Sequence, residues 1–212
     1  MKNRKYNNVV MLIAVFLSVL SLFSLIPGVL AVIGNPAHII DFLWSMLISV
    51  LLITASALLM KTRIPAFVPM LFHLITVTVS QVLILYSLIK SDIGAQILRF
   101  QGVRLLIIGL VLLITVCCGI SSFNNGTAGK ISSIAGIVLS ILYIAIKIVT
   151  IESLLPYMGG SLSSLADLSH HGEQAEISYS VITNVSQILF IVTYVIIFIG
   201  NFIAISQNKE QE

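Results

Sequence analysis

One lysine in this sequence lies where a charged residue is rarely tolerated. Lys147 belongs to the run ILYIAIKIVTI, which is apolar on both sides of it. An ionisable group inside an apolar helix is expensive and usually faces other helices or a water-filled cavity. Tyr143 precedes it by four residues, which places both side chains on one helix face. Lys147 and Tyr143 therefore predict a substrate or ion pathway, and the alternative is a lysine that snorkels to the membrane surface.

A histidine begins a second polar stripe in another apolar run. His73 lies in VPMLFHLITVTVSQVLILYSLI, and Thr76 and Ser80 follow it at offsets of three and seven residues. Helical geometry puts these three side chains on one face. Because an imidazole can carry a proton near neutral pH, the stripe predicts part of a solute or proton pathway. The alternative is that these groups only form hydrogen bonds between helices.

Small residues predict where helices approach one another closely. Ser132, Gly136 and Ser140 recur every four residues, a small-xxx-small pattern that favours close helix packing. Gly200 and Asn201 lie in a later apolar run and predict a second packing face. The first stripe shares its face with Lys147, so we expect that lysine to point toward another helix.

The best candidates for metal ligands are clustered near the end of a polar stretch. They are His170, His171 and Glu173. Structural zinc needs three or four ligands in a fixed geometry, and Gly172 interrupts any helix that would align these side chains. A solvated loop is therefore the preferred interpretation, and we expect no metal and no other cofactor.

The elements that carry these residues follow from composition. The chain has 212 residues, of which 58% are hydrophobic and 9% charged, with a mean hydropathy of +1.10. A soluble domain carries roughly 25% charged residues, so a soluble enzyme and a disordered chain are both excluded. About twenty apolar residues cross a bilayer core of ~30 Å as a helix. The chain therefore predicts an all-α polytopic membrane protein with six transmembrane helices, at about 9–34, 36–60, 64–89, 103–123, 131–155 and 183–205.

The connecting segments predict one transmembrane domain over residues 1–212. The longest connection is 156–182, where leucines recur every three residues and suggest a short amphipathic helix on the outer surface. Basic residues set the orientation of such a chain. With a cytoplasmic N-terminus the inner side holds Lys2, Arg4, Lys5, Lys61, Arg63, Lys130 and Lys209, and the outer side holds Lys90, Arg99 and Arg104. This bias predicts a plasma-membrane protein with both termini in the cytoplasm.

Three functions are compatible with the sequence. The first is an integral membrane subunit of a transport or efflux assembly, without its own ATPase because no G-x-x-x-x-G-K-[ST] motif is present. The second is a non-catalytic accessory protein that binds another membrane protein or protects against membrane-active peptides. The third and least favoured is an intramembrane enzyme that uses His73 or the 170–176 loop. We expect lipid contact and a membrane-protein partner or homo-oligomer, and no nucleic acid.

Overall fold

Every element that the structure describes is helical. The computed structural model describes residues 2–21, 25, 39–58, 62–90, 97–154 and 173–208. Six α-helices and one 3-10 turn lie in these ranges. Their bounds are α1 (Lys2–Ser21), α3 (Ile39–Leu58), η3 (Ile64–Ala66), α4 (Phe67–Lys90), α5 (Ile97–Phe123), α6 (Thr127–Leu154) and α7 (Glu173–Asn208).

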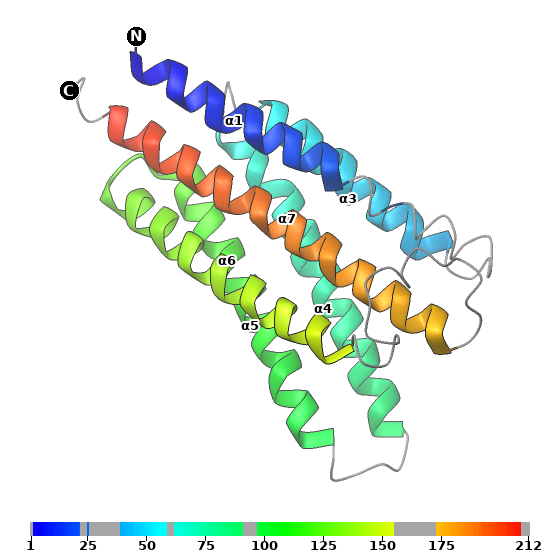
Figure 1. The fold of residues 1–212 in the computed structure, drawn as a ribbon. Coiled ribbons are helices and arrows are strands. Elements are labelled where there is room, and N and C mark those ends of the chain that lie inside the picture. Colours follow the sequence, from blue (N-terminus) through cyan, green and yellow to red (C-terminus); the bar gives the residue numbers. More distant parts are fainter. Residues whose placement is uncertain are drawn as a thin grey trace.

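The helices form a closed bundle in which each described helix packs against the next one along the chain. α3 contacts α4, α4 contacts α5, α5 contacts α6, and α6 contacts α7. The ring closes because α1 packs against both α3 and α7. Figure 1 shows α7 lying between α1 and α6, with α1 beginning beside the end of α7. α7 also touches α5, so it contacts three other helices.

Short connections make neighbouring helices antiparallel. Only three residues separate α5 from α6, and the side-chain oxygen of Asn124 accepts a hydrogen bond of 2.7 Å from the backbone N–H of Gly126. This is the local bond by which asparagine stabilises a tight turn. Between α3 and α4 the chain forms η3, where Pro65 stands in the first turn, a position that needs no N–H donor. Both turns reverse the direction of the chain, so that α4 runs antiparallel to α3 and α6 runs antiparallel to α5.

Within the described part of the chain, three helices are long and apolar enough to cross a membrane. The qualifying segments are Leu105–Phe123, Thr127–Glu152 and Thr183–Gln207. Shorter apolar stretches lie at Asn8–Leu20, Phe42–Leu58 and Ile64–Ser80. The composition and these spans indicate an integral, multi-pass membrane protein.

The outer surface of the bundle is also suited to lipid. Large apolar side chains on the outside of α6 are more than half exposed, among them Ile131, Ile134, Val138, Ile141 and Val149. A continuous apolar surface of this kind would drive aggregation in water, whereas acyl chains solvate it. The apolar side chains therefore support contact with a lipid bilayer.

Two helices begin earlier than the apolar runs predict. α5 starts at Ile97 instead of 103, and α7 starts at Glu173 instead of 183. The last ten residues of the predicted connection 156–182 are therefore helical, whereas the apolar span within α7 begins at Thr183, as predicted. The reason is that EQAEISYSVI contains good helix formers, glutamate, glutamine and alanine, but is too polar to satisfy a hydropathy criterion. The amphipathic helix predicted within this loop lies outside the described residues.

Other helix bounds also differ from the predicted segments. α1 begins at Lys2, so the basic leader before Val9 is part of the helix, and α6 begins at Thr127 instead of 131. α3 begins at Ile39 and ends at Leu58, within the predicted segment 36–60. The predicted end of the first helix at 34 lies outside the described residues.

Candidate functional site

α7 carries a row of buried and half-buried side chains at alternating spacings of three and four residues. This spacing keeps side chains on one face of a helix and is typical of a packing interface. The row consists of Asn184, Gln187, Ile191, Tyr194, Phe198, Asn201 and Ile205. Polar groups of α7 are therefore directed into the bundle, toward the helices that surround it.

The first of these polar residues holds the lysine that the sequence singled out. Lys147 of α6 is only 7% exposed, and its Nζ donates a hydrogen bond of 2.9 Å to Oδ1 of Asn184. The same Nζ lies 5.6 Å from the centre of the Tyr143 ring, within the range of a cation–π interaction. The ammonium thus points at α7 within the bundle and contacts a neutral amide and an aromatic face.

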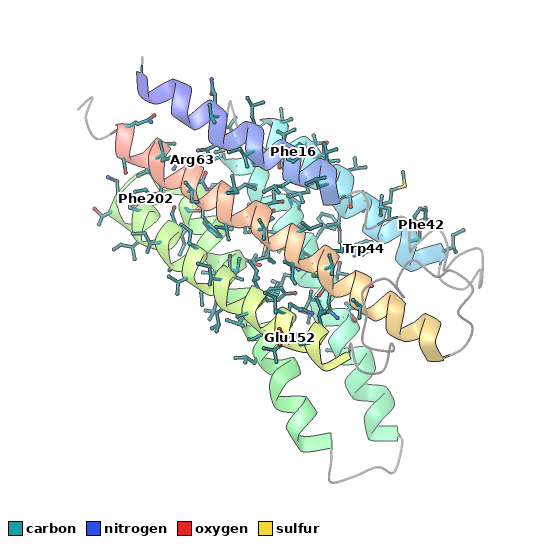
Figure 2. The ribbon with its side chains drawn as sticks, viewed as in Figure 1. Phe16, Phe42, Trp44, Arg63, Glu152 and Phe202 are labelled. Atoms are coloured by element: carbon teal, nitrogen blue, oxygen red, sulfur yellow. The ribbon has the colours of Figure 1, made fainter. Side chains whose placement is uncertain are left out.

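No carboxylate of a described side chain forms an ion pair with Lys147. Glu152 follows it by five residues on α6, but its side chain is exposed. Figure 2 shows Glu152 near the end of α6 and Arg63 toward the opposite end of the bundle. A buried ammonium that only neutral groups solvate keeps most of its desolvation cost. Within the described part of the chain the charge of Lys147 is therefore not neutralised.

A second hydrogen bond joins α6 to α7, one helical turn from the contact between Lys147 and Asn184. The hydroxyl of Tyr143 donates a hydrogen bond of 3.3 Å to Oε1 of Gln187, and Tyr143 is fully buried. Because α6 and α7 are antiparallel, the step from Lys147 back to Tyr143 matches the step from Asn184 forward to Gln187. The two helices are thus joined by two consecutive polar contacts on facing sides.

His73 of α4 approaches the same part of α7. Its imidazole is 5% exposed and lies 4.3 Å from the ring centre of Phe190, at an interplanar angle of 30°. Phe190 in turn lies 5.1 Å from the ring of Tyr194. His73 of α4, and Lys147 and Tyr143 of α6, therefore all contact α7.

Two buried polar atoms in this region have no hydrogen-bond partner among the described residues. They are Nε2 of His73 and Oγ of Ser140, which lies on the Lys147 face of α6. Most buried polar atoms in proteins are paired, so unpaired ones call for an explanation. We call the set Lys147, Tyr143, Asn184, Gln187, His73 and Ser140 the core polar cluster.

The remaining members of the predicted His73 stripe point elsewhere. The Thr76 hydroxyl donates to the backbone oxygen of Phe72 at 2.9 Å and accepts a hydrogen bond from Nε1 of Trp44. It thus connects α4 to α3, because an offset of three residues turns a side chain 60° away from His73. Ser80 is exposed. The structure places Thr76 in a helix–helix contact and leaves Ser80 on the surface.

Gly136 and Gly200 lie where helices pack most tightly. A Cβ at Gly136 would overlap the Phe198 ring of α7, and a Cβ at Gly200 would overlap the Met11 side chain of α1. Ser132 is buried on the same helix as Gly136. Glycine is therefore favoured at Gly136, where the Phe198 ring occupies the space of its missing Cβ, whereas at Gly200 only the flexible end of Met11 would have to move.

A second polar group lies at the end of the bundle where α5 and α7 meet the α3–α4 connection. Asn201 is buried, and its Nδ2 lies 3.2 Å from Oγ of Ser121. Nη1 of Arg63 donates a hydrogen bond of 3.2 Å to the backbone oxygen of Ser121, in the last turn of α5. Partial burial lowers the pKa of the Arg63 guanidinium from its ordinary value, because desolvation disfavours its charge. A cation here interacts favourably with the C-terminal end of the helix.

Sequence reasoning missed Asn184, Gln187 and Tyr194. The available signal was the alternating spacing of polar and aromatic residues along the last apolar run, which marks a buried face. The weak metal candidates His170 and His171 lie outside the described residues, and the side chain of Glu173 is not described. Among the described residues no group of three potential ligands is arranged to hold a metal ion.

Comparison of the chain with protein-family models, with curated proteins and with solved structures gives no match. A functional proposal for this chain therefore rests on the residues of the core polar cluster.

Proposed function

We propose that the chain is an integral membrane subunit of a transport or efflux assembly, with no ATPase of its own. The observation that carries this proposal is Lys147, a buried ammonium with no ion-pair partner among the described side chains. Helix packing does not need such a group, because small residues and hydroxyls join membrane helices at lower cost. Ionisable groups retained inside a membrane typically mark a substrate or ion pathway.

The proposed pathway runs past the face of α7 that bears Asn184 and Gln187. Supporting this placement, Lys147 and Tyr143 of α6 and His73 of α4 reach α7 from two sides. Thr76 and Ser80 were predicted for the same pathway, and we now place them outside it. Energy from ATP would come from a partner, since the sequence has no phosphate-binding loop of the G-x-x-x-x-G-K-[ST] type.

We further propose six spans in the plasma membrane with both termini in the cytoplasm. The support is the closed ring of antiparallel helices, the proximity of the start of α1 to the end of α7 (Figure 1), and the bias of basic residues. Single cysteines test this topology in a background that lacks Cys117 and Cys118. Asn125→Cys should react with an impermeant maleimide only from the cytoplasmic side, and Ser163→Cys only from outside. The opposite pattern would refute the orientation.

Flux through the purified protein tests the transport proposal. The full-length chain, and any protein that copurifies with it, would be reconstituted into liposomes and screened for counterflow of labelled small solutes. Lys147→Gln should abolish the flux, because it removes the charge while keeping a polar side chain. Glu152→Gln is the matched control, since this exposed charge lies on the same helix outside the core polar cluster.

The accessory function predicts a different result in the same preparation. A non-catalytic protein would give no flux, and deleting it would reduce the abundance or activity of a membrane-protein partner. Lys147→Gln would then leave that partner unaffected as long as the bundle still folds. Such a pair of results would replace the transport proposal with the accessory one.

A further inference from the structure

We propose that the turn formed by residues 63–66, before α4, is a gate that closes one end of the buried face of α7. We call this end, toward which α7 finishes, the inner end. When the gate opens, water reaches the buried face from the inner end. This inference deepens the proposed function, on which it rests for the pathway along α7, by naming the element that closes that pathway.

The polar face of α7 continues from the proposed pathway to the turn. Seven residues make two helical turns, so the face of Gln187 returns at Tyr194 and again at Asn201. Gln187 bonds to α6, whereas Tyr194 and Asn201 bond to groups at the inner end. A pathway that follows this face of α7 therefore meets the turn 63–66 at the inner end.

Two hydrogen bonds attach the turn to two different helices. The hydroxyl of Tyr194 in α7 donates to the backbone oxygen of Ala66 at 2.6 Å, and Ala66 is fully buried. Nη1 of Arg63 donates to the backbone oxygen of Ser121 at 3.2 Å, in the last turn of α5. Figure 2 shows Arg63 toward the inner end. Within the described part of the chain, one side-chain hydrogen bond thus holds the turn to each of these helices.

Buried polar atoms beside these bonds lower the cost of opening. Nδ2 of Asn201 lies 3.2 Å from Oγ of Ser121, the residue whose carbonyl accepts from Arg63. Oδ1 of Asn201 and Oγ of Ser122 are buried without a hydrogen-bond partner among the described residues. Unsatisfied polar atoms of this kind are costly, and water admitted at the inner end would satisfy them. Opening therefore regains free energy that offsets part of the loss of the two bonds.

The turn can move without unwinding a long helix. It contains η3, a single 3-10 turn, in which Pro65 has no N–H to donate. Among residues 63–66 only Ala66 is fully buried, and Ile64 is half exposed. Displacing the turn therefore exposes little additional apolar surface, which keeps local opening less costly than unfolding of the bundle.

A native cysteine reports on the gate. Cys118 is fully buried in α5, and its carbonyl accepts a hydrogen bond of 3.1 Å from the hydroxyl of Ser121. In the full-length protein with Cys117→Ala, Cys118 is the only thiol in the sequence. The small cationic methanethiosulfonate MTSET reacts with a thiol that water reaches. Mass spectrometry of the protein in detergent would measure the rate of this reaction.

Weakening the gate should accelerate the modification of Cys118. Tyr194→Phe and Arg63→Met each remove one attachment of the turn. We expect each to raise the rate roughly fivefold, the effect on an equilibrium of losing one typical hydrogen bond. The two substitutions together should raise it about twenty-five-fold if they act independently. An unchanged rate in the double variant would overturn the inference.

Controls separate opening of the gate from general loosening of the bundle. Gly136→Ala overpacks the contact with Phe198 away from the turn, so it should leave the Cys118 rate unchanged. A second buried thiol, Ala14→Cys on α1 in a chain without native cysteines, should stay unreactive in the gate variants. Acceleration of Cys118 by Gly136→Ala, or equal acceleration at residue 14, would overturn the inference.

The outcomes distinguish the gate from the transport proposal. Modification of Cys118 that depends on Tyr194 and Arg63, with no flux in liposomes, would support the gate and refute transport. Flux that depends on Lys147, with an unchanged Cys118 rate in the gate variants, would support transport and refute the gate.

Discussion

The hydroxyl of Tyr194 donates a hydrogen bond of 2.6 Å to the backbone oxygen of Ala66, although 128 residues separate them in the chain. Tyr194 lies in the middle of α7 and is fully buried, whereas Ala66 belongs to η3, the turn that leads into α4. A carbonyl oxygen has two lone pairs, so Ala66, which directly precedes α4, can accept the phenol hydrogen bond there. The bond thus fixes α7 against the α3–α4 connection.

Removing this hydroxyl should destabilise the bundle measurably. Tyr194→Phe keeps the ring but removes the hydrogen bond that joins α7 to Ala66, and we expect the free energy of unfolding to fall by about 1 kcal/mol. Denaturant unfolding in mixed micelles measures the change. Thr54→Val is the control, because that exposed hydroxyl bonds only within its own helix. A loss at Thr54 equal to that at Tyr194 would contradict this account.

The two glycines in neighbouring spans should respond differently to alanine. At Gly136 a Cβ would overlap the Phe198 ring, whereas nothing lies within 4 Å of a Cβ at Gly109. Gly136→Ala should lower the free energy of unfolding by roughly 1–3 kcal/mol through overpacking, and Gly109→Ala should leave it unchanged or raise it. Thermal unfolding of the two variants side by side measures the difference. Equal effects would show that the α6–α7 crossing tolerates a wider spacing.

Asn184 should contribute to stability because it accepts the hydrogen bond of a buried ammonium. Asn184→Leu removes the acceptor of the buried Lys147 ammonium, and we expect it to cost about 3 kcal/mol. Lys147→Met combined with Asn184→Leu should recover most of this loss, since no charge then remains to be solvated. If the double variant is no more stable than Asn184→Leu alone, the ammonium is solvated by something other than Asn184.

A pair of serines gives a measure of how strongly α1 is attached to α3. Oγ of Ser18 and Oγ of Ser56 lie 2.8 Å apart, and both side chains are buried. Hydrogen bonds between membrane helices contribute about 0.6 kcal/mol on average. A double-mutant cycle with alanine at both positions should give a coupling free energy of that size. A coupling near zero would mean that the contact adds nothing to the packing of α1.

Much of the fold follows from hydropathy. The helix starts that hydropathy places too late in the sequence have one cause. A hydropathy scan detects the apolar centre of a helix, so it locates α3 to within a few residues of its ends. It does not detect polar helical turns, because helix formation depends on backbone propensity and packing as well as on apolarity. The residues before Val103 and before Thr183 are therefore helical although the scan excludes them.

Part of the site was also predictable, because the geometry within one helix is fixed. Four residues bring a side chain back to the same face, so Tyr143 and Lys147 had to lie together. Which helix meets that face depends on contacts far apart in sequence, and so Asn184 was not identified. His73 was identified by residue type alone. Its contact with Phe190 comes from the way α4 packs near α7.

The place of α7 in the ring has a consequence for biosynthesis. Lys147 enters the membrane 37 residues before Asn184, its hydrogen-bond partner, is made. During that interval the ammonium has no partner from α7, and α1 also lacks the helix that covers Met11. Insertion of α7 completes both contacts at once. A ribosome that stalls before this helix would thus leave a charged, incompletely paired helix in the bilayer.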